Sequence, residues 1–281
     1  MDAVVVWSDT EGKEYRSKRL QYLKEYEDSA PTAETCRRLN ELMASIAAIL
    51  KFLDFVERIF LVTDTPHVKL MEFVKAVKNK AQMTVISHEE LYGNFSGFLP
   101  CFSSTAVRTI LYRINDMSEE FLLFECGCIP IRKMTEDEFR TDGTTCLFGH
   151  MERTAFLGRR KTFLPYPTPV ILSKAMIKEC LAANHGILLE NLKHRFNDKS
   201  QQDILKIILD SGIPHQNCQM SIVSLKPDSD AKMIEKLAST SDKDFLFWEP
   251  MHGFSPPQKQ ALLDYLAVLL RVSVPFQQRL P

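Results

Sequence analysis

Short apolar runs that end in polar residues recur along the first half of the chain, and longer amphipathic stretches separate them. Such runs are typical of buried strands, because the strands of a parallel sheet are covered on both faces. Strands that alternate with helices predict an α/β fold with a mainly parallel central sheet and flanking helices. We expect strands at 3–7, 58–64, 83–86, 121–124 and 144–148, and helices at 15–26, 68–80 and 105–114. A further helix is expected after Thr32, which can cap it, with apolar positions between Leu39 and Leu50.

Helical patterns dominate the second half of the chain. The proline-rich stretch 164–169 marks the join between the two halves. We expect a single domain over 1–281, with an α/β part at 1–150 and a mostly helical part at 160–281 packed on the same sheet. The predicted helices are 174–183, 188–196, 201–210 and 258–272, and short strands are predicted at 220–224 and 244–248.

Composition narrows the class of protein. The 281 residues are 45% hydrophobic and 25% charged, which is ordinary for a globular protein. Basic and acidic residues number 35 and 36, so no broad basic surface for nucleic acid is expected. No apolar run approaches the roughly 20 residues that cross a bilayer, and the first residues lack the basic region of a signal peptide. Seven scattered cysteines favour a reducing compartment over a disulfide framework, which predicts a cytoplasmic protein.

Four titratable residues closely follow predicted strands: Asp9, Asp64, His88 and Glu125. In an open parallel sheet, ligands bind beyond the carboxyl ends of the strands. The four side chains are therefore expected at one edge of the sheet, although they are far apart in the sequence. Each also has a structural alternative, because polar residues after strands often serve only to stabilise turns.

The segment 85–139 carries the most specific pattern in the chain. It reads VISHEELYGNFSGFLPCFSSTAVRTILYRINDMSEEFLLFECGCIPIRKMTEDEF. This resembles the second conserved region of the Stealth family of sugar-phosphate transferases, roughly I-x-I-x-x-H-x-E, L-P-x-F-x-S-x-A-[IV]-E and H-R-I-x-x-[LM]-S-E-x-F-[LI]-Y-x-N-D-D. His88, Ser104 and Arg113 occupy matching positions. The resemblance implies a fold like that of nucleotide-sugar transferases.

Other stretches extend the resemblance over most of the chain. The family's first region, which contacts the nucleotide sugar, is matched loosely near the start. A strand of the pattern I-Y-[IL]-V-T-D and the H-R-F-R of the third region are matched farther along. The matching residues are Trp7, Asp9 and Gly12 in the first region, Asp64 after the strand, and His194 and Arg195 in the third region.

Departures from the family pattern concentrate at charged positions. Glu125, Cys126 and Gly127 replace the Asn-Asp-Asp that ends the second region. Adjacent carboxylates there hold Mg²⁺ or Mn²⁺ against a diphosphate, and neither cysteine nor glycine offers a side-chain oxygen. Met43 and Ala47 replace two helix arginines, and apolar side chains cannot bind phosphate.

The resemblance implies a set of candidate site residues without metal ligands. No cofactor is expected, although an intact family member would need Mg²⁺ or Mn²⁺. If the strand aims positions 126 and 127 at the cleft, changing both residues to Asp is expected to create divalent-metal binding. The implied catalytic residues are Asp64, His88 and Arg195, and the implied substrate-binding residues are Trp7, Asp9, Gly12, Ser104, Arg113, Glu125 and His194.

Three functions are compatible with this pattern. The leading one is a Stealth-like protein of capsule polysaccharide biosynthesis that has lost the metal-dependent transfer and acts as a binding or regulatory subunit. The second is an active transferase that moves a sugar-1-phosphate from a nucleotide sugar to a glycan hydroxyl at a rebuilt, metal-independent site. The third is a nucleotide-sugar sensor. The expected partners are a nucleotide sugar or glycan and a polysaccharide-assembly protein, with no nucleic acid.

Overall fold

The protein is described by a computed structural model whose residues group into two compact units. The first unit comprises 1–38, 57–123 and 172–213, and the second comprises 39–56, 124–171 and 214–281, so the two interleave along the chain. The single domain expected from the sequence stays a prediction. The structure describes residues 1–8, 12–23, 39–64, 72, 82–153, 161–165, 169–184, 186–211, 215–218, 221–227, 230–240, 243–248 and 253–271.

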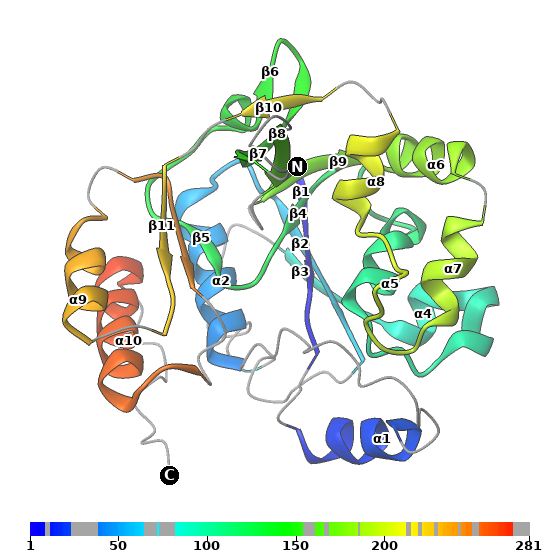
Figure 1. Ribbon diagram of the computed structural model, residues 1–281, viewed down its shortest axis with the longest axis horizontal. Coiled ribbons are helices and arrows are strands. Elements are labelled where there is room, and N and C mark those ends of the chain that lie inside the picture. The colour runs from blue at the N-terminus through cyan, green and yellow to red at the C-terminus, as the bar shows by residue number, and fades with distance from the viewer. Residues whose placement is uncertain are drawn as a thin grey trace. The chain divides into compact units, whose positions relative to one another are not determined.

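A five-stranded sheet with the strand order β3-β2-β1-β4-β9 is the centre of the first unit (Figure 1). β1, β2 and β3 are parallel, as the sequence predicts. By their contacts, the last residue of β4 and the first two of β9 belong to the second unit. The strands are β1 (Asp2–Val6), β2 (Arg58–Thr63), β3 (Gln82–Ser87), β4 (Glu120–Phe124) and β9 (Val170–Ser173).

Burial explains which strands the sequence predicts best. Almost every residue of β1 and β2 is buried, so both strands read as continuous apolar runs. β3 lies at the edge of the sheet, and only Ile86 of its six residues is buried. At the amino end of β1, the carboxylate of Asp2 accepts hydrogen bonds from Arg58 Nε and Nη2, at 2.8 and 2.7 Å, and from Ser118 N at 2.7 Å.

The first unit also contains several short helices. The helix expected at 105–114 is interrupted at Ile110, whose φ of −112° and ψ of 11° separate α5 from a 3₁₀ helix. The helix expected from 201 begins later, because the Asp203 side chain accepts a hydrogen bond from Leu205 N and caps it. The helices are α1 (Lys13–Leu23), α4 (His88–Tyr92), α5 (Ser104–Thr109), α6 (Lys174–Ala183), α7 (Ile187–Lys193) and α8 (Ile204–Asp210), with 3₁₀ helices η1 (Gly93–Phe98) and η2 (Leu111–Arg113).

The second unit contains two smaller sheets. One has the order β11-β12-β5, in which β12 is parallel to β11 and antiparallel to β5. The other has the order β10-β7-β6, and β8 pairs with the distal part of β7 as a hairpin. The strands are β5 (Cys128–Pro130), β6 (Arg140–Thr141), β7 (Thr144–Arg153), β8 (Lys161–Pro165), β10 (Gln216–Cys218), β11 (Ile222–Leu225) and β12 (Phe245–Trp248).

The helices in the described part of the second unit are α2 (Leu39–Phe52), the 3₁₀ helix η3 (Glu136–Phe139), α9 (Asp230–Ala238) and α10 (Pro256–Leu270). α2 places Leu42, Ile46 and Ile49 in the core, and α10 contacts both α2 and α9. α10 begins with a capping box in which Ser255 and Gln258 satisfy each other's backbone N–H groups. None of the helices in the described ranges is long and apolar enough to cross a membrane.

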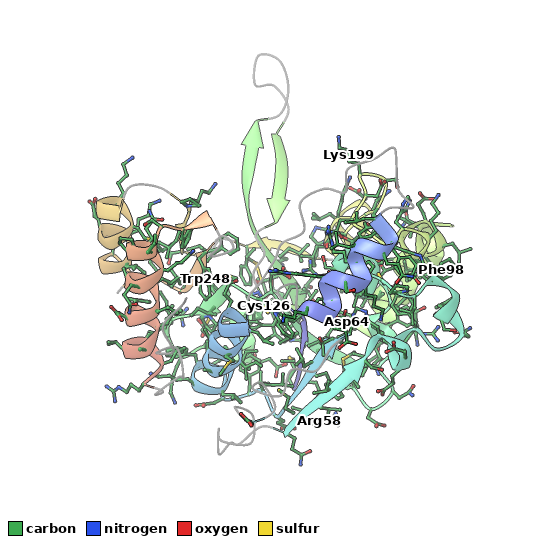
Figure 2. All side chains as sticks on the ribbon, turned by 90° about the horizontal axis from the view of Figure 1, so that it is seen from below. Arg58, Asp64, Phe98, Cys126, Lys199 and Trp248 are labelled. Carbon is green, nitrogen blue, oxygen red and sulfur yellow. A yellow bond between two sulfur atoms is a disulfide. The ribbon has the colours of Figure 1, made fainter. Side chains whose placement is uncertain are left out.

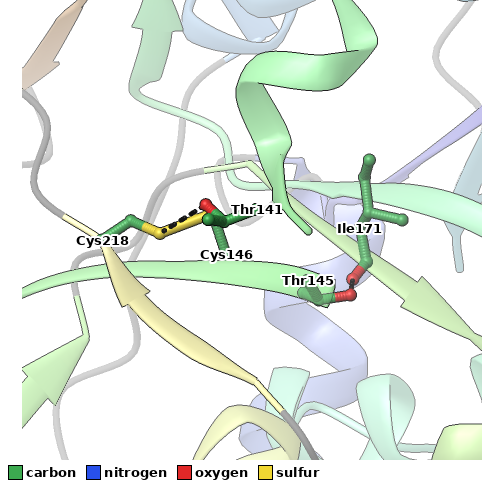
Figure 3. The surroundings of a disulfide bond; sticks show 5 residues. All are labelled: Thr141, Thr145, Cys146, Ile171 and Cys218. Carbon is green, nitrogen blue, oxygen red and sulfur yellow. Dashed lines mark hydrogen bonds between the residues drawn. A yellow bond between two sulfur atoms is a disulfide. The ribbon is translucent and has the colours of Figure 1, made fainter. Parts of the chain in front are cut away.

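A disulfide joins Cys146 of β7 to Cys218 of β10 (Figure 3). The parallel pairing of the two strands brings the Cα atoms to 5.6 Å although 72 residues separate them in the sequence. The Thr141 hydroxyl lies 3.0 Å from Cys146 Sγ. The expectation that the cysteines would not form disulfides is therefore wrong for this pair, because only the tertiary pairing reveals it.

Candidate functional site

The parallel strands of the first unit bring three predicted site residues to one edge of the sheet. The Trp7 amide donates to the Val62 carbonyl at 2.9 Å, which continues the β1–β2 ladder past its last pair. Thr63 pairs with Ser87, so Asp64 and His88 come one residue beyond the end of the β2–β3 register. Figure 2 shows Asp64 and Arg58 at opposite ends of β2. We name this edge, with Trp7, Asp64 and His88, the carboxyl edge.

His88 is the first residue of α4 and is almost completely buried. Its Nε2 atom has no hydrogen-bond partner among the residues that the structure describes. Burial lowers the pKa of His88 to about 4, the Glu89 carboxylate opposes this shift, and the Lys18 ammonium adds to it. The imidazole is therefore neutral near pH 7, and its unpaired nitrogen can bind a hydroxyl group or receive a proton.

Arg195 lies between two segments of the first unit. Its Nη1 atom donates to the carbonyls of Phe98 and Pro100, at 3.3 and 3.1 Å, and its guanidinium lies 4.9 Å from the centre of the Tyr22 ring of α1. No carboxylate pairs with this half-buried guanidinium within the described part of the chain. It is thus held by neutral groups, which leaves its charge available to an anionic ligand.

The charges of Arg195 and of Asp64 at the carboxyl edge both influence the buried thiol of Cys101. Burial raises the pKa of Cys101 to about 11, against the lowering effects of the Tyr92 hydroxyl and the Arg195 charge, while the Asp64 carboxylate raises it further. Asp64 and Arg195 therefore both act on one buried sulfur atom. Burial also raises the pKa of the Tyr92 hydroxyl, so this phenol stays protonated.

Other predicted site residues of the first unit make local contacts. Arg113 donates to the Leu91 carbonyl and to Asn94 Oδ1, at 3.3 and 2.6 Å, which ties η2 to η1. His194 Nε2 lies 3.2 Å from Glu190 Oε1 and 3.0 Å from the Ser200 hydroxyl. These contacts favour a structural role for Arg113 and His194.

The remaining residues of the first unit occupy loops and helix starts. Ser104 is the first residue of α5, but the neighbouring Ser103 makes the capping hydrogen bond. The carbonyl of Gly12 accepts from Arg16 N at the start of α1, and Asp9 lies outside the described residues. Sequence reasoning missed Ser103, and its only signal was a second serine directly before a helix.

Residues 124–128 belong to the second unit, and both backbone groups of Gly127 are hydrogen-bonded there. Gly127 has a φ of 86°; its N–H donates to Ser45 Oγ at 3.3 Å, and its carbonyl accepts from Trp248 N at 2.9 Å. The Cys126 side chain is buried, and Glu125 is half-buried beside it. Only Gly adopts such a φ without strain. The Cys126 thiol offers no oxygen, so it cannot be a ligand of the kind that Mg²⁺ prefers.

These residues do not fit the Mg²⁺ or Mn²⁺ that the resemblance implies. No group of three or more His, Cys, Asp or Glu side chains within the described ranges could hold a metal ion. The positive φ of Gly127 also argues against the expectation that Asp residues at 126 and 127 would point into a cleft. The common cleft of Asp9, Asp64, His88, Glu125 and Arg195 stays a prediction, since Asp9 is not described and Glu125 belongs to the other unit.

The fold is shared with a solved galactosyltransferase, LgtC, in complex with donor and acceptor sugar analogs. The TM-score is 0.51 at 11% sequence identity, and the match covers 98% of this chain and 97% of that one. At this identity the likeness concerns the fold alone. The predicted α/β fold, a central sheet with flanking helices, is therefore confirmed.

The sequence comparisons find similarity to polysaccharide phosphotransferases. A capsular polysaccharide phosphotransferase from Actinobacillus suis is 31% identical over 170 residues, which cover 59% of this chain and 44% of that protein. An exopolysaccharide phosphotransferase from Streptomyces coelicolor is 25% identical over 196 residues, which cover 69% of this chain and 32% of that protein. The chain thus spans less than half the length of these relatives. Residues 35–147 match Stealth protein CR2, conserved region 2, so the resemblance to this region is confirmed.

Proposed function

We propose that the chain binds a phosphate-bearing sugar ligand at the carboxyl edge and serves capsule or exopolysaccharide synthesis as a binding or regulatory subunit. In this proposal it does not catalyse the metal-dependent transfer of sugar phosphate. The resemblance to polysaccharide phosphotransferases supports the biosynthetic role. Both a nucleotide sugar and a phosphate-bearing glycan carry a phosphate group on a sugar, and this is the group that the site would recognise.

The conformation of Gly127 is the observation that carries the proposal. A metal-binding carboxylate at this position would require a side chain in the left-handed region, where non-glycine residues are strained. Both backbone groups of Gly127 are bound to Ser45 and Trp248, so the turn cannot rotate without breaking two hydrogen bonds. The turn has become part of the packing of the second unit.

Arg195 supports the binding half of the proposal. A diphosphate needs a divalent cation or arginines to neutralise its charge. Arg195 offers a guanidinium without a described carboxylate partner, and two backbone carbonyls already fix its orientation. Asp64 and the neutral imidazole of His88 could accept hydroxyl groups of the sugar, since both are hydrogen-bond acceptors.

One observation favours an active, metal-independent transferase as a second function. The unpaired Nε2 of buried His88 could take the proton of a glycan hydroxyl while its oxygen attacks the sugar-linked phosphorus. The bond from that phosphorus to the bridging oxygen would break, and a nucleoside monophosphate would leave. The pKa of about 4 makes His88 a weak base near pH 7, so this reaction would be slow and would slow further as the pH falls.

A transfer assay separates the two functions. The full chain is incubated with radiolabelled nucleotide sugars and a glycan acceptor, with Mg²⁺, with Mn²⁺ and with a chelator. The leading proposal predicts no label in the glycan under any condition. Transfer that is independent of metal and abolished in His88→Leu would support the second function. Transfer that depends on metal would overturn both.

A further inference from the structure

Two distant segments of the first unit are locked together on both sides of Arg195. The Phe102 amide donates to the Arg195 carbonyl at 2.6 Å, and the ring of Phe102 stacks on Phe196 with 5.1 Å between centroids. The Arg195 side chain in turn donates hydrogen bonds to the carbonyls of Phe98 and Pro100. The loop after α7 therefore holds its arginine against residues 98–102, almost a hundred residues earlier in the sequence.

The hydroxyl of Ser103 is the centre of the polar contacts in this junction. Ser103 is 1% exposed, and its Oγ atom lies 2.8 Å from Asn197 Oδ1 and 2.9 Å from Gln201 Oε1, both in the loop of Arg195. The same oxygen accepts from Ala106 N at 3.2 Å and caps α5. A hydroxyl has one hydrogen, so Ser103 can donate to only one of these two amide oxygens at a time, while its own oxygen accepts from Ala106 N; the hydroxyl thus joins the loop to α5.

The junction continues into the core of the unit. Gln201 Nε2 donates to the carbonyl of Asn191 at 2.8 Å, and Asn191 is fully buried on α7. The Asn191 amide bonds in turn to Thr109 Oγ1 of α5 and to the Gln202 carbonyl, both at 2.8 Å. The loop is thus anchored beyond Arg195 by a buried network, in which a single lost partner leaves other polar groups unsatisfied.

We propose that Ser103 is a positioning residue for Arg195. It fixes the loop at 197–201 so that the guanidinium keeps one orientation toward the ligand phosphate. The inference rests on the proposed function, in which Arg195 contacts that phosphate. Ser103 does not itself touch the ligand: it is buried, and all its described polar contacts are to protein groups.

A purely structural role for Ser103 makes a different prediction. If Ser103 only caps α5, its loss lowers stability, as for any N-cap serine. Ser173 provides the matched control, because it caps α6 by accepting from Met176 N at 2.9 Å without a described contact to the Arg195 loop. Both substitutions should reduce stability, but only Ser103→Ala should alter the guanidinium of Arg195.

The test uses the full chain and inorganic pyrophosphate as the probe of anion binding, measured by calorimetry. We expect Ser103→Ala to weaken binding about tenfold, Ser103→Thr to restore most of it, and Ser173→Ala to change it less than about twofold. In an Arg195→Ala background, Ser103→Ala should have no further effect, because there is no guanidinium left to position. The Arg195 side-chain N–H signal in NMR spectra should shift in Ser103→Ala and stay in place in Ser173→Ala.

The outcomes separate this inference from the proposed function. If Arg195→Ala weakens pyrophosphate binding while Ser103→Ala does not, the positioning role is wrong and the phosphate contact stands. If Arg195→Ala leaves binding unchanged, the phosphate contact is wrong, and the positioning role with it. Should Ser103→Ala fail to fold, Asn197→Ala removes the partner on the loop side and leaves the α5 cap intact. Unchanged binding in that variant would equally overturn the inference.

Discussion

Asp64 and His88 at the carboxyl edge of the first unit and the turn at 125–128 of the second each directly follow a strand, yet the polar groups of the two regions are used differently. At the carboxyl edge, buried His88 keeps a nitrogen atom without a described partner. In the turn, both backbone groups of Gly127 are bound to neighbouring residues. An unsatisfied buried group costs free energy and is retained where a ligand can pair with it, whereas a satisfied group stabilises the fold. The difference supports the proposal that the ligand binds to the first unit and that the turn has a structural role.

The largest effect is expected from placing carboxylates in the turn. Changing Cys126 and Gly127 together to Asp puts one charge in a buried site and a side chain at a φ of 86°. Strain of about 1–3 kcal/mol and the burial of a charge should lower the free energy of unfolding by more than roughly 4 kcal/mol. Chemical denaturation followed by fluorescence measures this loss.

The chain offers a convenient reporter for each unit in its two tryptophans, Trp7 in the first and Trp248 in the second. A Trp7→Phe background restricts the signal to the second unit, where the double Asp variant should lose its unfolding transition. Cys126→Ala is the control, because it removes a thiol without adding charge. A stable double variant that binds Mg²⁺ would show that the turn can hold a metal ion, and would contradict its purely structural role.

The disulfide should stabilise the second unit alone. Linking Cys146 to Cys218 closes a loop of 72 residues, and the loop-entropy estimate for this length is roughly 4 kcal/mol. Reduction, or Cys218→Ser, should therefore shift the transition reported by Trp248. The transition reported by Trp7 in a Trp248→Phe background should move much less. Equal shifts for both reporters would show that the two units unfold as one.

Burial of neutral His88 predicts a pH-dependent stability of the first unit. The pKa of His88 is about 4 in the folded chain, against an ordinary value of 6.5. Below pH 6.5 the unfolded chain gains a proton that the folded chain does not take up until about pH 4. The free energy of unfolding should therefore fall by about 3 kcal/mol as the pH falls between these values.

The free energy of unfolding of the matched variant His88→Leu should therefore depend less steeply on pH. Denaturation monitored through Trp7, from pH 4 to pH 7, gives the comparison. Identical slopes in the parent and the variant would mean that His88 is protonated or solvated in the folded state. Its unpaired nitrogen would then be no indication of a ligand.

The smallest effect concerns the amino edge of the same sheet. Burial raises the pKa of Asp2, but the hydrogen bonds from Arg58 and Ser118 outweigh it and hold the pKa below its ordinary value. Asp2→Asn should lower the free energy of unfolding by about 2 kcal/mol, since charged hydrogen bonds become neutral ones. Pyrophosphate affinity should not change, because Asp2 and the carboxyl edge lie at opposite ends of the strands. A loss of affinity would show that the site is not confined to that edge.

The sequence predicted the strands and helices that neighbouring residues mark, either by a continuous apolar run or by a capping residue. The continuous apolar run of β2 marked a strand buried on both faces. The helix at 174–183 begins directly after its capping serine, and its predicted bounds are those of α6. Asp64 and His88 could be placed at one sheet edge, because parallel strands impose that position on residues that follow them.

Features that depend on pairing between distant segments could not be predicted. β10 has only three residues, and its bond through Cys218 follows from its place beside β7 rather than from any spacing. Ser103 looked like any residue before a helix, because its partners lie almost a hundred residues away. The positive φ of Gly127 likewise comes from contacts with α2 and β12, and the sequence showed only that carboxylates were missing.

The fluorescence of Trp7 in a Trp248→Phe variant, titrated with a panel of nucleotide sugars, tests the central claim most directly. Trp7 ends β1 at the carboxyl edge, so a ligand there should change its emission. The account predicts saturable binding of at least one nucleotide sugar, with affinities in Mg²⁺ and in chelator that agree within about threefold, and loss of about tenfold or more in Arg195→Ala. Binding that requires Mg²⁺, or that is unaffected by Arg195→Ala, would contradict it.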